Sequence, residues 1–542
     1  RRRGQAKRRE QRNTDVLERI SNRPGARVHK SPADASMPPL PARTAAGLLR
    51  APPRLAAAAR RSLASRTSTL ATAPWAAASS RTAARPSSRC GAARCLSSRD
   101  FSRRDFSTRE GDGALPKKPD YRSANTHHDI QKAPLNKSLA ASESMEAVLD
   151  IFESRHTEFC AVNTATAIHR IAKVFKLSRP TKGSKKVVDP RMSKLATFAA
   201  SRVDAFDTRG LSTVVWGVAS VGNVQGAQYL FDCVSDRIFE TPDLMRQCNA
   251  HDLTNMAWAY AKAGMAAPQL FEAMAAESVK KMATFKPQGI SNLVWAYSVA
   301  GVSAPAMFDA VSAEITLNSI VNFNAQVLVN IITAYSKAGH SSVELYEAIA
   351  RESIQKIHAF NSQALANIAW AYAKAGVEAP ALFDAVENEV PAKLKFMNSQ
   401  NIADLAWSFA TMHLAKPALF DQLASQAPQE MKWFTANSFA RVSWAYATAK
   451  IPAPELFALM AAELPKEIKW FTTAHLADTA WAYAAAGAGA PTLFEVLAEE
   501  AVAKLAVFTP EELAKLQAAF ETARFESPSL QNAIAGRVQV DS

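Results

Sequence analysis

The chain has 542 residues, and because 48% of them are hydrophobic it is long and apolar enough to bury a continuous core. No apolar run reaches the roughly 18 residues that a membrane-spanning helix needs, so the sequence predicts no transmembrane segment. The formal net charge of +15 comes from the N-terminal segment, because residues 1–107 carry 24 basic and 6 acidic side chains whereas residues 201–542 carry 24 and 33.

Residues 1–107 are predicted to form a disordered, basic targeting leader. Between Met37 and Arg99 there are 11 Arg and no Lys, Asp or Glu, a composition typical of organelle import signals. Residues 94–98 and 104–108 resemble mitochondrial processing sites, so we expect the mitochondrial matrix, with a chloroplast address or a merely disordered tail as alternatives. The chain begins with Arg1, and Met37 is a candidate for the true start.

The next two segments connect this leader to the repeated part of the chain. Residues 108–137 are predicted to be a linker, and residues 138–206 to be degenerate capping helices. The stretch from Arg170 to Lys194 holds nine Lys or Arg residues and one acidic residue, Asp189. Such a stretch is suited to sequence-independent contacts with phosphates, or it is a flexible surface loop.

A motif that recurs every 37 or 38 residues dominates the rest of the chain. A Trp marks the period, with Thr333 in the one position where it is missing, and a Pro recurs in phase, with Val343 in its gap. The Trp positions are Trp258, Trp295, Trp370, Trp407, Trp444 and Trp481. The Pro positions are Pro268, Pro305, Pro380, Pro417, Pro454, Pro491 and Pro528. A fixed period of this length predicts a stacked array of structural repeats.

Each repeat reads as a helical hairpin. In residues 360–396, Asn361 is a candidate N-cap, Gly376 is placed to end the first helix, and Pro380 is placed to open the second. Each hairpin leaves an apolar face that only stacking on neighbours can bury. The sequence therefore predicts an all-α fold, a right-handed α-solenoid of about nine 37–38-residue hairpins over residues 207–542.

Several repeats resemble those of octotricopeptide-repeat proteins, which bind RNA in plastids and mitochondria. The resemblance is carried by residues 360–376 (FNSQALANIAWAYAKAG) and 285–297 (FKPQGISNLVWAY), and it covers roughly residues 207–530. Related repeats precede RAP domains, occur in FAST-kinase-like proteins, and are similar to those of the kinetoplastid RNA-editing substrate-binding complex. The resemblance implies binding, processing, stabilisation or translation of organellar transcripts. No RAP-like segment follows residue 530, and the array is acidic, which departs from the expected pattern.

Two polar positions recur on the first helix of each repeat, three and seven residues before the Trp. Because they are four residues apart, they share one helix face with the lysines further along. The position three before the Trp holds Asn255, Asn292, Asn330, Asn367, Asp404, Arg441, Asp478 and Lys515. The position seven before it holds Gln288, Gln326, Gln363, Gln400 and Asn437, and the lysines are Lys262, Lys337 and Lys374. These residues are our predicted RNA-binding site, with one base read per repeat.

Other interpretations of these positions remain open. An amide ladder also serves to tie adjacent repeats together, and the Trp and Tyr positions suit a core better than a stacking platform. On the second helix, Glu277, Glu352, Glu389 and Glu500 each precede a Lys by four residues. We interpret these as solvated intrahelical pairs, with a phosphate-binding lysine row as the alternative.

No catalytic or metal-binding motif is present. The chain has no GxGxxG, P-loop or HExxH pattern, and its five cysteines form no CxxC pair. We therefore expect a protein that is not an enzyme and has no cofactor. The predicted partner is single-stranded organellar RNA, within an assembly that includes other proteins. The rival interpretation is a protein-binding scaffold in an organellar ribosome or other assembly.

Overall fold

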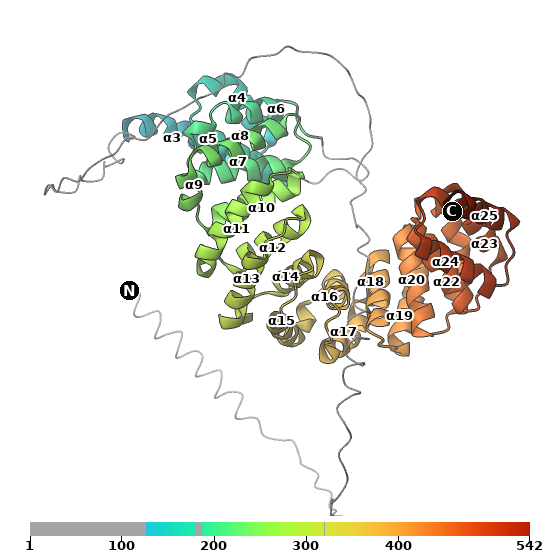
Figure 1. The fold of residues 1–542 in the computed structure, drawn as a ribbon. Coiled ribbons are helices and arrows are strands. Elements are labelled where there is room, and N and C mark those ends of the chain that lie inside the picture. Colours follow the sequence, from blue (N-terminus) through green and yellow to red (C-terminus); the bar gives the residue numbers. More distant parts are fainter. Residues whose placement is uncertain (1–125, 179–186, 319, 542) are drawn as a thin grey trace, which may run out of the picture. The chain divides into compact units, whose positions relative to one another are not determined.

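In the computed structural model, the described residues are 126–178, 187–318 and 320–541 (Figure 1). By its contacts the chain divides into residues 1–113 and 114–542, and every described residue belongs to the second unit. This part of the chain is helical throughout, with helices α3 to α25 and no strand. The predicted leader, residues 1–107, lies outside the described residues.

The helices alternate between the two members of a hairpin, and one short extra helix, α9 (Pro242–Gln247), follows α8. The first helices are α3 (Thr126–Ala141), α5 (Ala161–Leu177), α7 (Thr208–Val221), α10 (Ala250–Ala263), α12 (Pro287–Ala300), α14 (Ala325–Ala338), α16 (Ser362–Ala375), α18 (Ser399–Thr411), α20 (Ala436–Ala449), α22 (Thr473–Ala485) and α24 (Pro510–Thr522). The second helices are α4 (Met145–Arg155), α6 (Arg191–Ala200), α8 (Ala227–Glu240), α11 (Pro268–Lys281), α13 (Pro305–Leu317), α15 (Val343–Gln355), α17 (Pro380–Lys393), α19 (Pro417–Glu430), α21 (Pro454–Glu463), α23 (Pro491–Ala503) and α25 (Pro528–Asp541).

Each first helix packs against the first helix of the next hairpin, from α3 to α24, and Figure 1 shows the hairpins succeeding one another in chain order. This arrangement confirms the predicted all-α solenoid, and the nine hairpins from α7 to α25 are those that the sequence period marks. Two more hairpins, α3–α4 and α5–α6, precede them in the same packing pattern. The array therefore begins earlier than residue 207, and residues 126–137 are helical rather than linker.

Local signals in the sequence determine where the helices begin and end. Asn324, Asn361 and Thr435 are N-caps whose side-chain oxygens accept a backbone N–H from the first turn. Lys286 occupies the same position without a side-chain bond, because an ammonium cannot accept one. Gly376 ends α16 with φ 66°, in the left-handed region that glycine adopts without a Cβ penalty.

Lys450 occupies the position of Gly376 in a later repeat, with φ 55°. We expect Lys450→Gly to raise the free energy of unfolding by about 0.5–1 kcal/mol, because it relieves the left-handed strain of an L-residue. Gly376→Ala is the matched reverse change and should lower the free energy of unfolding. An added Cβ meets nothing within 4 Å, so the effect comes from the left-handed backbone alone. Urea denaturation should shift the two variants in opposite directions, and a shift in the same direction would contradict this origin of the effect.

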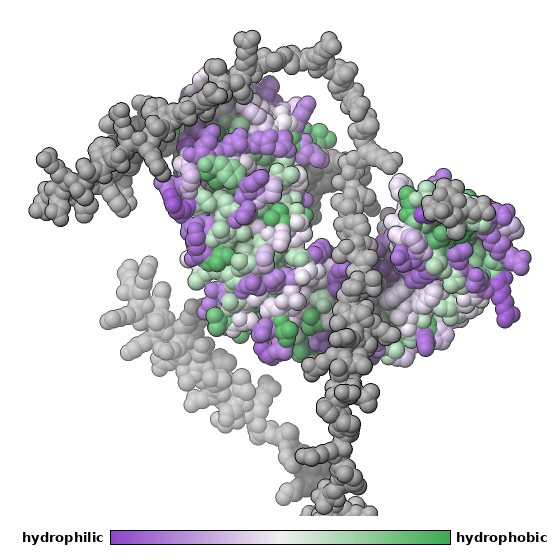
Figure 2. Space-filling view, in the orientation of Figure 1, coloured by the Kyte–Doolittle hydropathy of each residue, from purple (hydrophilic) through white to green (hydrophobic). Residues whose placement is uncertain are grey.

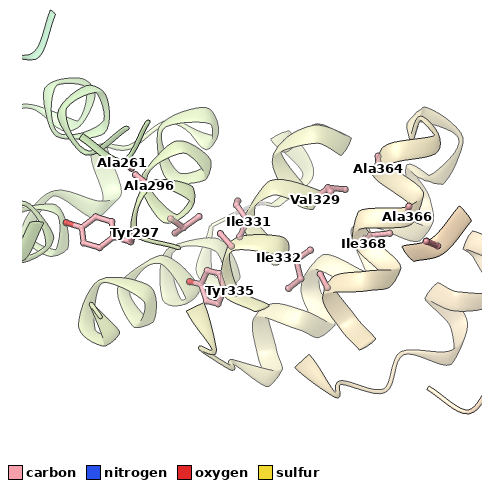
Figure 3. Packing of buried hydrophobic residues seen from close by; sticks show 14 of the residues in the cluster. Ala261, Ala296, Tyr297, Val329, Ile331, Ile332, Tyr335, Ala364, Ala366 and Ile368 are labelled. Carbon is pink, nitrogen blue, oxygen red and sulfur yellow. The ribbon is translucent and has the colours of Figure 1, made fainter. Parts of the chain in front are cut away.

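Neighbouring hairpins are joined through a buried Tyr on most first helices from α10 to α22, with Phe409 at this position in α18. The hydroxyl of Tyr335 donates to the carbonyl oxygen of Phe308 in the preceding hairpin at 2.6 Å, and their rings meet edge to face at 4.9 Å. Tyr372 makes the equivalent bond to Tyr346. Figure 3 shows Tyr335 with Ile331 and Ile332 of α14 among the buried residues between hairpins. The prediction that the Tyr positions form the core is confirmed.

The lysines at the ends of the second helices form a second connection between hairpins. Lys356 pairs with Glu352 at 2.6 Å and also donates to the carbonyl oxygens of Val321 and Phe323, at 2.6 and 2.7 Å. Lys504 repeats this pattern with Glu500, Lys469 and Phe471, and Lys281 with Glu277, Arg246 and Cys248. The predicted Glu–Lys pairs form, but they are not solvated, because Glu352 is only 4% exposed. The ammonium groups of these lysines are occupied by carbonyl oxygens at the end of the preceding hairpin. They are therefore not placed to bind the phosphates of an RNA.

Candidate nucleic-acid interface

The predicted site residues share one face of the first helices, as their spacing requires. In α10 to α16, Gln288, Gln326 and Gln363 are exposed, and the asparagines three residues before the Trp are half-buried. Lys262, Lys337 and Lys374 are exposed. We call this section the amide face, comprising Asn255, Gln288, Asn292, Gln326, Asn330, Gln363, Asn367, Lys262, Lys337 and Lys374. Figure 2 shows hydrophilic and hydrophobic residues interspersed over the visible side of the described residues.

The amides of this face pair within their own helix. Gln288 Nε2 donates to Asn292 Oδ1 at 3.0 Å, and Gln326 Nε2 donates to Asn330 Oδ1 at 2.7 Å. Each pair keeps the Gln carbonyl oxygen as an acceptor and the Asn amino group as a donor for other partners. Among the described contacts, none joins an amide of this face to an amide of the neighbouring hairpin. The interpretation of the amides as ties between repeats therefore has no support from α10 to α16.

The same positions behave differently in the C-terminal hairpins, where they carry charge. Asp404 of α18 is 7% exposed and forms an ion pair with Arg441 of α20. Asp478 of α22 pairs with Lys515 of α24 at 2.5 Å. These contacts join adjacent hairpins, so this section consists of structural ties.

The pKa values of Asp404 and Arg441 are shifted by the burial of this ion pair. Burial raises the pKa of Asp404 although Arg441 and Gln400 lower it, and burial lowers the pKa of Arg441. Gln400 donates to Asp404 at 2.8 Å, so it belongs to the pair. Asn437 is half-buried, and its Nδ2 is a buried atom without a hydrogen-bond partner.

The Trp residues form a partly exposed ladder beside the amides, and only the Tyr residues are fully buried. Trp258 lies between Trp216 and Trp295, with ring centroids 6.5 and 6.3 Å apart. Cations also lie over these rings: Lys176 over Trp216 at 4.6 Å, and, in the C-terminal hairpins, Arg441 of the next hairpin over Trp407 at 5.3 Å. The predicted core role of the Trp residues therefore holds only in part.

The N-terminal end of the ladder opens into a groove of about 710 Å³ between α5, α7 and α10. It is lined by His169, Arg209, Trp216, His251 and Asn255, among others. Burial lowers the pKa of His169, and the nearby positive charges of Lys173, Arg209 and Arg170 lower it further. The groove is therefore an electropositive extension of the amide face.

Sequence reasoning missed all of this groove except Asn255. His169 occupies the Trp position of α5, and Arg209 and His251 lie seven residues before Trp216 and Trp258. The missing Trp in α5 and the insertion that contains α9 displace these hairpins from the 37-residue period, which is why the pattern did not reveal them. Aligning the upstream first helices with α10 by their position in the helix, rather than by a fixed 37-residue period, identifies His169, Arg209 and His251.

Within the described ranges, no group of three or more His, Cys, Asp or Glu residues is arranged to hold a metal ion. None of the helices described is both long and apolar enough to cross a membrane.

The fold and this face define the chain as a tandem helical-hairpin protein with a continuous polar surface along its first helices. Residues 261–541, more than half of the chain, match the sequence model of the RNA-editing substrate-binding complex 6 protein family. The chain therefore belongs to this family. The matched segment runs from the end of α10 to α25 and contains most of the amide face.

No curated protein matches the chain. Among solved structures, a homology model of the full-length AP-3 complex in an intermediate open conformation is similar at 9% identity. That match covers 74% of this chain and 79% of the other, and its TM-score of 0.26 is too low to support an argument.

Proposed function

We propose that this protein binds single-stranded RNA along the amide face and contributes to RNA processing within a complex that contains other proteins. The observation that supports this proposal is the set of polar groups the face leaves open. Each Gln–Asn pair keeps an acceptor and a donor after its internal hydrogen bond. A base edge carries the complementary groups, and helical-repeat proteins read unstacked bases with two or three side chains per repeat.

The lysines of the face supply the phosphate contacts. Lys262, Lys337 and Lys374 are exposed and lie seven residues beyond Asn255, Asn330 and Asn367, and no ion pair is described for them. The groove at the N-terminal end adds the cation Arg209, and His169 and His251 line it as hydrogen-bonding groups. The array as a whole is acidic, so RNA is favoured only where these cations gather.

The family and the leader give this proposal its cellular setting. The family is named for an RNA-editing substrate-binding complex, which supports a role in RNA processing alongside other proteins. The resemblance to octotricopeptide repeats supports reading of bases by successive hairpins. The arginine-rich composition of residues 37–99 supports the mitochondrial matrix, with the chloroplast as the alternative.

The amides are tested by the double change Asn330→Ala with Asn367→Ala in the full chain. Two lost contacts of about 1 kcal/mol each should weaken binding of a random-sequence 20-nucleotide RNA pool about 30-fold. Fluorescence anisotropy measures the affinity, and thermal unfolding should show little change, because neither amide joins two hairpins. Gln269→Ala, at an exposed position of the second helix α11, is the matched control and should leave affinity unchanged. A loss of stability without a loss of affinity would contradict the proposal.

A further inference from the structure

Three consecutive turns in the C-terminal half of the array expose an aromatic side chain. Each is the last residue of a 3-10 turn that leads from a second helix to the next first helix: Leu394–Phe396, Met431–Trp433 and Ile468–Trp470. Phe396 is 67% exposed, Trp433 62% and Trp470 75%. Single exposed apolar residues are ordinary on a protein surface, but large aromatics repeated at 37-residue intervals call for an explanation.

At this turn position, only these three of the described hairpins carry an exposed aromatic residue. The equivalent turn positions upstream hold Thr284, Asn322 and Ala359, which are small or polar. Downstream, Val507 is 69% exposed but is preceded by Ala506 rather than by a lysine. Packing of the turns cannot require the aromatics, because the upstream turns form the same geometry without them.

A lysine precedes each of the three aromatics. Lys395 lies over the ring of Phe396 at 5.1 Å, and Lys432 over that of Trp433 at 5.3 Å. Lys395, Lys432 and Lys469 are all exposed, and no ion pair to them is described. We call Phe396, Trp433 and Trp470 with their three lysines the aromatic turn row.

We propose that the aromatic turn row is a docking surface for an acidic amphipathic helix of a partner protein. Trp side chains are enriched among the energetic anchors of protein interfaces, and the neighbouring lysines complement Asp and Glu on the partner. Packed helices generally lie about 8–10 Å apart, so successive turns of the row should be spaced by about that distance. Residues seven apart on a helix share a face and are spaced about 10.5 Å, so apolar residues at seven-residue intervals would meet successive turns.

The surroundings of the row favour a protein over RNA. The net charge of residues 391–541, with 12 basic and 15 acidic side chains, does not separate RNA from an acidic helix, so the assignment rests on the polar positions of the neighbouring first helices. The first helices of the same hairpins have their polar positions closed by the ion pairs of Asp404 with Arg441 and of Asp478 with Lys515. The row is thus separate from the amide face, and the two proposals do not depend on each other.

The test places the photo-crosslinking residue p-benzoylphenylalanine at position 433 or 470 of the full chain in its native assembly. The control position is 317, because Leu317 is 83% exposed and lies outside the row. Mass spectrometry of the crosslinked peptides should recover a segment of another protein in which Asp or Glu accompanies apolar residues seven apart. Crosslinks to RNA, to a second copy of this chain or to a basic segment would overturn the proposal. Yields no higher than at position 317 would overturn it as well.

Substitutions then measure how much the row contributes. With the crosslinked segment as a labelled peptide, Trp433→Ser with Trp470→Ser should weaken binding at least ten-fold. Replacing the three lysines by glutamate should weaken it at least as much and reverse its salt dependence, because salt then screens a repulsion. Both variants change exposed side chains, so circular dichroism should show unchanged folding. Unchanged peptide affinity in both variants would contradict the assignment while leaving RNA binding by the amide face untouched.

Discussion

Arg441→Ala is expected to lower the free energy of unfolding by about 3–5 kcal/mol, because it strands a buried carboxylate. The side chain of Asp404 is 9% exposed and that of its partner Arg441 is 17% exposed. Once the guanidinium is removed, only Gln400 remains as a side-chain partner of the carboxylate. Urea denaturation followed by circular dichroism measures the loss.

The loss in free energy of unfolding caused by Arg441→Ala should become smaller as the pH falls. Burial raises the pKa of Asp404 in the folded protein above its value in an unfolded chain, and Arg441 is the main group that lowers it. In the variant the ionised carboxylate therefore opposes folding at neutral pH. As the pH falls through the raised pKa, Asp404 becomes protonated in the folded state and the deficit should shrink. A deficit that grows on acidification would contradict this account.

Asp404→Asn combined with Arg441→Asn should restore most of the stability. This pair recreates the neutral amides that Asn330 and Asn367 provide at the same positions of α14 and α16. Replacing both members of a buried ion pair is often nearly neutral, so we expect a free energy of unfolding within about 1–2 kcal/mol of the natural protein. A double variant as unstable as Arg441→Ala would show that the pair itself is required.

Replacing Lys262, Lys337 and Lys374 together by glutamine is expected to weaken RNA binding about 100-fold at 0.1 M salt. Each phosphate contact to a single strand contributes about 0.7 to the slope of log affinity against log salt. Three lost contacts should therefore reduce that slope by about 2. Anisotropy titrations of the random RNA pool over a range of salt concentrations measure both quantities.

The matched control replaces Lys395, Lys432 and Lys469 by glutamine. This variant removes the same charge from three equally exposed lysines on the aromatic turn row. RNA affinity and its salt dependence should remain those of the natural protein. Equal losses in the two triple variants would mean that RNA is held by net charge alone and that the amide face has no special role.

The repeat period and the helix boundaries could be predicted from the sequence because they depend on local signals. Asn361, Gly376 and Pro380 each act within a turn of their own position, and the structure places all three at helix ends. The Tyr positions were predicted to be core, since burying a large ring against a neighbouring hairpin follows from periodicity alone.

The contacts between hairpins could not be predicted in the same way. Asp404 and Arg441 are 37 residues apart, and only the register of stacked helices brings them together. The same holds for Lys356, whose carbonyl partners lie in the preceding hairpin. The predicted RNA-binding positions therefore divide into an open section from α10 to α16 and a section closed by ion pairs. Whether the open section binds RNA stays a prediction.

Ultraviolet crosslinking of the protein to RNA in isolated organelles, with mass spectrometry of the peptides that carry nucleotides, locates the contact surface itself. We expect crosslinked peptides from the first helices α7, α10, α12, α14 and α16, centred on the amide face and its groove. The ion-paired helices α20 and α24 should carry few. RNA binding by the amide face would be contradicted if crosslinks were confined to α18–α25. It would also be contradicted if none of the described helices carried a crosslink.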